Sequence, residues 1–218
     1  MGPTVFNLKL FLISAFILLA SLQYQALKIR EKGHRDLTPL PAGIHKYSFG
    51  QQFALADFAW IRSIQDFDYC ENEIRKGQCR NNGWLYQMLE SITLLDPKFK
   101  EPYNYGGLAL SIIISDIAGA SQIFKKGVQQ FPTDWVLAYK AAYHALYEEK
   151  DNLKAAQMME AAAKHGAPDW VYSLAGKLYA DGGRKELAIH LYDELRQSAA
   201  APPDVLKKLK DRINQASE

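Results

Sequence analysis

The chain has 218 residues, of which 48% are hydrophobic and 23% are charged, a composition that suits a globular protein with a real core. Its net charge is +2, and its basic residues are scattered among acidic ones, so the sequence does not favour a nucleic acid as partner. The N-terminal segment differs in composition from the rest of the chain and is considered first.

An apolar segment without any charged residue runs from Leu10 to Leu27. As a helix it would be about 27 Å long, close to the thickness of the hydrocarbon core of a bilayer. Residues 10–22 are apolar on every side rather than along one stripe, which disfavours a soluble amphipathic helix. We therefore predict a membrane anchor over residues 1–28. A cleaved signal peptide is the alternative, although Leu18-Leu19-Ala20 is a poor cleavage site.

Residues 29–48 are rich in charge, proline and glycine, which predicts a linker between the anchor and the body of the protein. The orientation of the anchor is open, because two observations disagree. The positive-inside rule would place the body in the cytoplasm, since the apolar segment is followed by Lys28, Arg30, Lys32 and Arg35. The cysteines indicate the opposite side.

Cys70 and Cys79 are the only cysteines, and they flank a polar loop. A disulfide between them would restrict the unfolded chain by roughly 2–3 kcal/mol, and such bonds persist in oxidising compartments. The alternative is a pair of free thiols in a cytosolic loop. A zinc site is disfavoured, because two sulfur atoms without a second Cys or His pair supply half of the ligands. We predict an exported, periplasmic body.

The stretch from Tyr172 to Tyr192 predicts a tight helical hairpin. Leu174, Ala175 and Leu178 form one apolar stripe at helical spacing, and a second stripe follows in Leu187, Ala188, Leu191 and Leu195. Gly182-Gly183 separates them, because glycine tolerates the left-handed conformation that ends a helix. The small Gly176 is predicted to lie where the two helices of this hairpin meet.

The same pattern recurs along the chain. The second helix of each unit carries a small residue with a bulky residue four positions later, as in Ala120 and Phe124, and a proline closes it. The prolines at positions 97, 132, 168 and 202 are spaced by 35, 36 and 34 residues. A fixed period of this size predicts an array of helical hairpins over residues 49–200.

This period and pattern resemble the tetratricopeptide repeat (TPR) family. The best copy of the family signature is formed by Tyr172, Ala175, Gly176, Tyr179, Gly183, Ala188 and Tyr192. Other units depart from it: IIISDIAGA replaces one glycine turn, and the first unit is degenerate, with the cysteine loop inserted between residues 49–67 and 84–97. Residues 201–218 contain a final amphipathic helix, which would cap the array. The architecture also resembles membrane-anchored repeat proteins of bacteria.

The resemblance implies an all-α solenoid whose first helices line a concave surface that holds an extended peptide or a partner helix. By repeat position the lining would include Asn104, Leu108, Lys140, His144, Tyr147, Ser173 and Lys177. Lysine and asparagine side chains could bind the carboxylate of a peptide end by donating hydrogen bonds to it. The family's full carboxylate clamp is not present. A solvated face without a peptide groove is the alternative.

No pattern for catalysis is evident. The five histidines include no pair at the three- or four-residue spacing of a helical metal site, and the sequence contains no nucleophile elbow or phosphate-binding loop. We therefore expect a non-catalytic membrane scaffold without cofactors. One rival is an enzyme or accessory subunit that uses Asp57 and Arg62 in the degenerate N-terminal helices. Asp57 stands in an apolar run, where we expect a nearby cation or backbone donor to satisfy it. Another rival is a secreted repeat domain.

Overall fold

The computed structural model describes residues 13–25, 37–41, 43–66, 70, 79–198 and 201–215. The chain divides into two units, Met1–Thr38 and Pro39–Glu218. In the first unit, residues 13–25 form a helix with mostly exposed side chains. Among the described residues, none of the helices combines the length and apolar character that crossing a bilayer requires. Residues 1–12 and 26–28 of the predicted anchor lie outside the described part of the chain.

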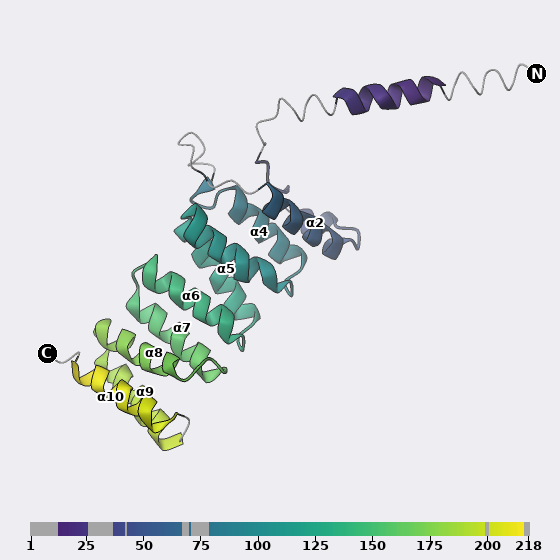
Figure 1. Ribbon diagram of the computed structural model, residues 1–218. Coiled ribbons are helices and arrows are strands. Elements are labelled where there is room, and N and C mark those ends of the chain that lie inside the picture. Colours follow the sequence, from purple (N-terminus) through teal and green to yellow (C-terminus); the bar gives the residue numbers. More distant parts are fainter. Residues whose placement is uncertain are drawn as a thin grey trace, which may run out of the picture. The chain divides into compact units, whose positions relative to one another are not determined.

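The second unit consists of helices, and its described residues contain no strand (Figure 1). The prediction of an all-α fold is confirmed. A 3-10 turn, η1 (Ile44–Tyr47), precedes the longer helices. These are α2 (Gln52–Gln65), α4 (Trp84–Leu95), η2 (Pro102–Gly106), η3 (Ala109–Ile114), α5 (Ile117–Gln130), α6 (Trp135–Tyr147), α7 (Asn152–Lys164), α8 (Trp170–Asp181), α9 (Lys185–Ser198) and α10 (Pro203–Gln215). Segments η2 and η3 are π-helical stretches of one continuous helix over residues 100–114.

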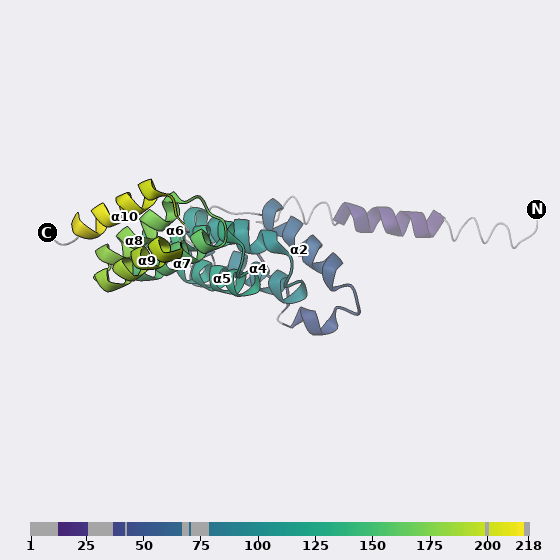
Figure 2. The same cartoon turned by 90° about the horizontal axis from the view of Figure 1, so that it is seen from below.

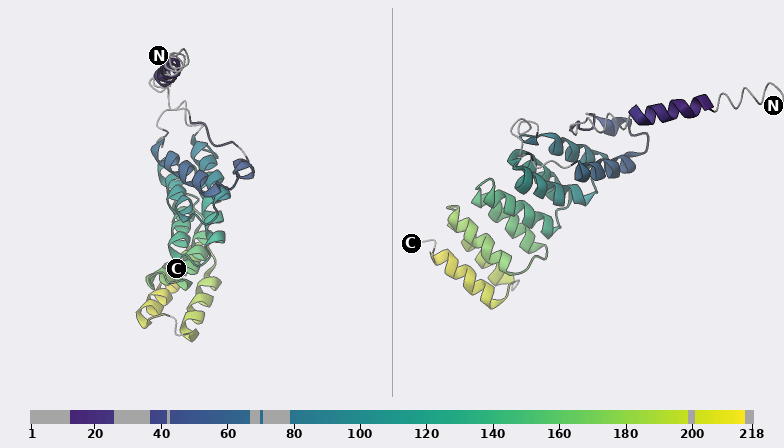
Figure 3. Two further views of the ribbon diagram at one scale, coloured as in Figure 1. Left: turned by 90° about the vertical axis from the view of Figure 1, so that its right-hand side faces the viewer. Right: turned by 45° about the horizontal axis from the view of Figure 1, so that its top comes forward.

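The helices pack on one another in chain order. α2 contacts α4, the η2–η3 helix contacts α5, α6 contacts α7, and α8 contacts α9. Each of these pairs is also joined to the next, since α4 contacts α5, α5 contacts α6, and α7 contacts α8. α10 packs on both α8 and α9. Figures 1 and 2 show α2 and α10 at opposite ends of this unit, and the turned views of Figure 3 show the same order. This repeat-like succession is compatible with an α-solenoid.

Aspartates begin three of the helices in the middle of the unit. Asp116, Asp134 and Asp151 each accept a hydrogen bond from the backbone N–H three residues later, at 2.9–3.0 Å. This is the N-cap bond that satisfies one of the free N–H groups of the first turn. These caps fix where α5, α6 and α7 start, so the hairpin boundaries depend on them as well as on the prolines that follow each second helix.

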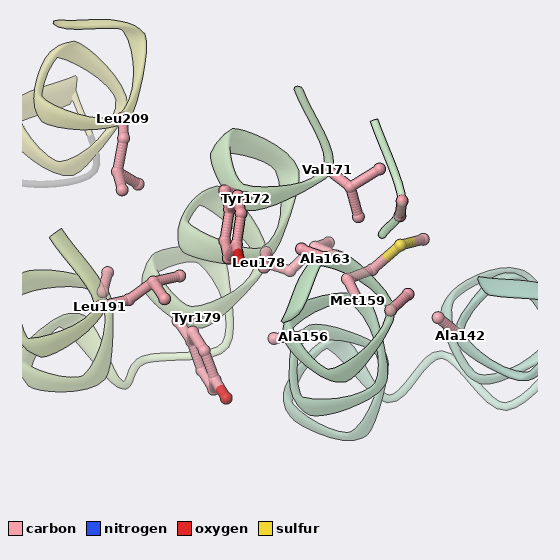
Figure 4. Close-up of a cluster of buried hydrophobic side chains, with 14 of the residues drawn as sticks. Ala142, Ala156, Met159, Ala163, Val171, Tyr172, Leu178, Tyr179, Leu191 and Leu209 are labelled. Carbon is pink, nitrogen blue, oxygen red and sulfur yellow. The ribbon is translucent and has the colours of Figure 1, made fainter. Parts of the chain in front are cut away.

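The core of the C-terminal half is built from alanines with a few large side chains between them (Figure 4). Ala142, Ala156 and Ala163 let α6, α7 and α8 approach closely, while Met159 and Val171 fill the space between the backbones. Toward α9 and α10 the larger side chains are Tyr172, Leu178, Tyr179, Leu191 and Leu209. Small residues opposite large ones therefore set the distances between these helices.

The position of Gly176 differs from the prediction. A Cβ atom at Gly176 would lie 2.0 Å from Cδ1 of Leu209, which belongs to α10. The prediction that Gly176 lies between the two helices of its own hairpin is therefore wrong. The reason is that α8 packs on α10 as well as on α9, and a helical stripe of small residues does not indicate which neighbour it contacts.

Replacing Gly176 by leucine is expected to lower the free energy of unfolding by about 1–3 kcal/mol, because the added side chain needs the space that Leu209 fills. At an uncrowded helix position, replacing glycine should instead stabilise the fold, because glycine costs about 1 kcal/mol relative to better helix formers. A loss of stability would therefore indicate crowding against Leu209. Urea unfolding followed by circular dichroism would measure the change. The exposed neighbour Lys177, replaced by leucine, is the control, and an unchanged midpoint for Gly176→Leu would contradict this packing.

Candidate partner-binding surface

The residues predicted to line a partner surface fall into three groups by exposure. Asn104, His144 and Ser173 are buried, with exposed fractions of 7%, 1% and 2%. Leu108 and Lys140 are half-buried, and Tyr147 and Lys177 are exposed. The buried His144 offers no surface to a partner. A repeat position identifies the helix on which a residue lies, but it does not reveal which side the neighbouring helices cover.

Lys140 connects the first helices of two successive pairs. Its Nζ donates a hydrogen bond to Oδ1 of Asn104 at 3.2 Å and stands 4.6 Å from the ring centre of Tyr105. Burial lowers the pKa of Lys140 from its ordinary value, although Asp134 acts in the opposite direction. Because a lysine ammonium has three donors, Lys140 can bind a further acceptor beside the exposed Tyr105.

α6 also presents an aromatic pair. The rings of Tyr143 and Tyr147 lie 4.5 Å apart, one helical turn from each other, and both side chains are exposed. Tyrosines are enriched at protein interfaces, because they offer a large apolar area with a polar end. Of these two tyrosines, Tyr147 belongs to the predicted surface, and Tyr143 extends it along α6.

His144 lies at the centre of a buried polar network. Hydrogen bonds join its Nδ1 to Ser111 Oγ at 2.7 Å and its Nε2 to Ser121 Oγ at 3.0 Å. Ser121 donates in turn to Glu149, whose carboxylate lies 3.5 Å from His144 Nε2 and 2.6 Å from Lys154 Nζ. Serine, histidine and a carboxylate are the components of a hydrolytic triad. Ser111 and His144 are each only 1% exposed, so we assign this network a structural role that joins η3, α5, α6 and α7.

The network shifts the pKa values of its two titrating members. Burial lowers the pKa of His144, because the imidazolium would lose its hydration. Burial acts to raise the pKa of Glu149, but the hydrogen bonds from Lys154 and Ser121 outweigh it and hold that pKa below its ordinary value. At neutral pH the network therefore contains a neutral imidazole at His144 and an ionised carboxylate at Glu149.

Acidification below pH 6.5 is expected to destabilise the fold. The unfolded chain takes up a proton at His144 near its ordinary pKa of 6.5, whereas the folded chain does so at a lower pH, so the free energy of unfolding falls as the pH drops through this range. Between pH 7.5 and pH 5.5, the melting temperature of His144→Gln should change less with pH than that of the unmodified protein. Glu149 adds a further loss only below its own ordinary pKa of 4.5. The exposed His165, replaced by glutamine, is the control, and an unchanged slope in His144→Gln would contradict the role of this group.

A cavity of about 690 Å³ opens between α8 and α10, and we call it the α8–α10 cavity. Its lining residues are Asp169, Trp170, Ser173, Leu174, Pro202, Asp204, Val205, Lys208 and Arg212. The hydroxyl of Ser173 is buried and has no hydrogen-bond partner among the described residues. Burying a hydroxyl without a partner costs free energy, so a ligand that supplies one would be favoured here.

The two cations of the α8–α10 cavity, Lys208 and Arg212, form few interactions with the described residues. Nη1 of Arg212 donates to the backbone oxygen of Ser173 at 2.9 Å. Neither Arg212 nor Lys208 forms an ion pair with a described carboxylate. Lys208 and Arg212 are four residues apart on one side of α10, a spacing that could have been noticed in the sequence. Ser173 could be identified from its repeat position, whereas the amphipathic pattern of α10 indicated only a cap.

Asp57 and Arg62, the residues of the enzymatic alternative, are not brought together. Asp57 is exposed on α2, while Arg62 pairs with Asp66 at 3.3 Å. Arg62 is therefore committed to another carboxylate, while Asp57 faces the solvent. Within the described ranges, no cluster of three or more metal-ligating side chains occurs either.

The cysteine region is fixed to the rest of the unit by several contacts. The sulfur atoms of Cys70 and Cys79 are bonded at 2.12 Å. Immediately after Cys79, Nε of Arg80 donates to the backbone oxygen of Ile114 at 2.8 Å. The backbone N–H groups of Asn81 and Asn82 donate to the carboxylate of Asp116, at 3.1 and 3.0 Å. Asp116 thus caps α5 and also holds the chain that leads into α4.

Comparisons of this chain with family models, with curated proteins and with solved structures gave no match.

Proposed function

We propose that this protein is a membrane-anchored scaffold of tetratricopeptide-repeat type that binds a protein partner and catalyses no reaction. The chain-order packing of the helices supports a repeat array, as do the proline spacings of 35, 36 and 34 residues. The uncharged apolar segment Leu10–Leu27 supports the anchor. The bond between Cys70 and Cys79 supports an exported body, because disulfides persist in oxidising compartments.

The observation that carries the binding function is the α8–α10 cavity. It combines a buried hydroxyl without a partner at Ser173 with the two cations Lys208 and Arg212, which have no carboxylate partner in the described structure. Leu174 and Val205 add apolar surface, and Trp170 is half exposed at the rim. A peptide segment with an acidic side chain beside an apolar one would use the two cations and this apolar surface.

Co-purification from membranes after chemical cross-linking, with the partner identified by mass spectrometry, tests this proposal. Lys208→Glu is expected to lower partner recovery about tenfold, because the acidic group of the partner would meet a like charge. Lys207→Glu is the matched control, since Lys207 is exposed on the same helix, makes the same change in net charge and does not line the cavity.

Equal recovery in Lys207→Glu and Lys208→Glu would show that the partner does not use the α8–α10 cavity. If no protein co-purifies with the unmodified chain, the scaffold function itself is wrong. Turnover of a substrate by the purified protein would favour the enzymatic alternative.

A further inference from the structure

α2 turns an apolar side to the solvent. Phe53, Phe58, Ile61 and Ile64 are 52–59% exposed, and we call these four residues the α2 apolar face. The opposite side of the same helix, with Ala56, Ala59 and Ser63, is buried. α2 thus buries small residues and exposes large ones, the reverse of what a terminal helix needs for solubility.

The other end of the array shows the expected pattern. α10 buries Val205, Leu209 and Ile213 against its neighbours and exposes Lys207, Lys210, Asp211 and Asn214. Terminal units of helical arrays need such a polar outer side, because no further unit covers them. Since α2 and α10 lie at opposite ends of the unit (Figure 1), the described residues of this unit cap the array at one end and leave it open at the other.

Asp57 restricts what can cover the open end. It lies one helical turn from both Phe53 and Ile61, so any partner that buries these two residues also removes water from the Asp57 carboxylate. Burying a carboxylate carries a large cost in free energy unless a cation or hydrogen-bond donors replace the water. In the described structure Asp57 is exposed, and the nearest candidate cation on α2, Arg62, pairs with Asp66.

This carboxylate disfavours two possible occupants. Lipid hydrocarbon supplies no cation and penalises an ionised side chain. A second copy of α2 would place the same face against itself across a two-fold axis, and Asp57 lies near the middle of that face, so the two carboxylates would approach each other. A helix of another protein with an apolar side and one basic residue satisfies both the apolar area and the charge.

We propose that the α2 apolar face binds an apolar helix of a partner protein, and that a Lys or Arg on this helix pairs with Asp57. The partner helix completes the array at its open end, as a further repeat would. This surface lies at the end opposite the α8–α10 cavity, so it goes beyond the function proposed above and can be tested separately from it.

Site-specific photo-cross-linking of the full-length protein in its native membranes tests the proposal. A photoreactive amino acid is placed at Phe53, Ile61 or Ile64, and in a control at Gln129, which is exposed on α5. We expect the three α2 positions to give one common protein adduct that is absent from the control. Mass spectrometry should locate the adduct on a helical segment that contains a lysine or arginine.

Charge variants supply the specificity test. Asp57→Lys should lower the adduct yield about tenfold or more, and Asp57→Asn should lower it less, because only the first places two cations together. Changing the basic residue of the partner to glutamate in the Asp57→Lys background should restore the adduct. Because Asp57 is exposed, both variants should keep the helical circular dichroism of the unmodified protein.

Several outcomes would overturn this inference. One is that adducts form only with lipid, with a second copy of the chain or with its own residues 13–25. Others are that no adduct forms, or that Asp57→Lys leaves the yield of a protein adduct unchanged. The experiment also separates this inference from the proposed scaffold function. Lys208→Glu should leave the α2 adducts unchanged, and Asp57→Lys should leave recovery through the α8–α10 cavity unchanged.

Discussion

Replacement of Asp116 by alanine is expected to lower the free energy of unfolding by about 3 kcal/mol or more. The carboxylate is 1% exposed and accepts hydrogen bonds from the backbone N–H groups of Asn81, Asn82 and Gly119 at 3.0–3.1 Å. Its removal leaves three donors without their partner, and each such buried group costs about 1–3 kcal/mol, less where water can reach it. Urea unfolding monitored by far-ultraviolet circular dichroism would give the difference.

Asp151→Ala is the matched comparison. Asp151 is exposed and caps α7 with one side-chain bond, to the backbone N–H of Lys154, so its loss should cost about 1 kcal/mol. Asp116→Asn should fall between the two, since an amide keeps one acceptor oxygen. Equal losses in Asp116→Ala and Asp151→Ala would show that the contacts to Asn81 and Asn82 contribute nothing to stability.

Breaking the bond between Cys70 and Cys79 by the change Cys79→Ser is expected to lower the free energy of unfolding by about 2–3 kcal/mol. The bond closes a short loop, and its loss frees the unfolded chain to adopt more conformations. Unfolding curves with and without a reductant would measure the effect. The double variant Cys70→Ala/Cys79→Ala should not respond to the reductant, which controls for its effects elsewhere.

The same cysteines report on the compartment. If the body is exported, alkylation of the protein in intact cells should modify neither thiol before reduction. Two thiols that react readily would contradict the exported location. The basic residues that follow the apolar segment, which include Lys28 and Arg30, would then be the better guide to orientation.

The all-α fold could be predicted because its signals are local. α8, for example, spans Trp170–Asp181 and ends at Gly182, as the apolar stripe and the glycine pair indicated. The contacts around Asp116 could not be predicted in this way. They join groups 34 and 35 residues apart, and a carboxylate that binds two distant N–H groups has the same sequence signature as an ordinary helix cap.

The candidate site was predicted less well than the fold. Ser173 was identified from its repeat position and does line a cavity, but His144, chosen by the same reasoning, is buried in a hydrogen-bond network. The difference arises because neighbouring helices cover different sides of α6 and α8. The exposure of the α2 apolar face was missed for the same reason: an apolar run predicts burial, and only the packing shows which of its residues are covered.

The π-helical turns of residues 102–106 and 109–114 have an evolutionary consequence. A π-helix bonds each residue to the fifth one along rather than the fourth, so each wide turn stores an extra residue inside a continuous helix. Insertions of single codons can thus be absorbed here without lengthening a loop. Such an insertion also rotates the later side chains of the helix about its axis. The direction in which a residue such as Ser111 points can therefore change while the loops of the repeat keep their length.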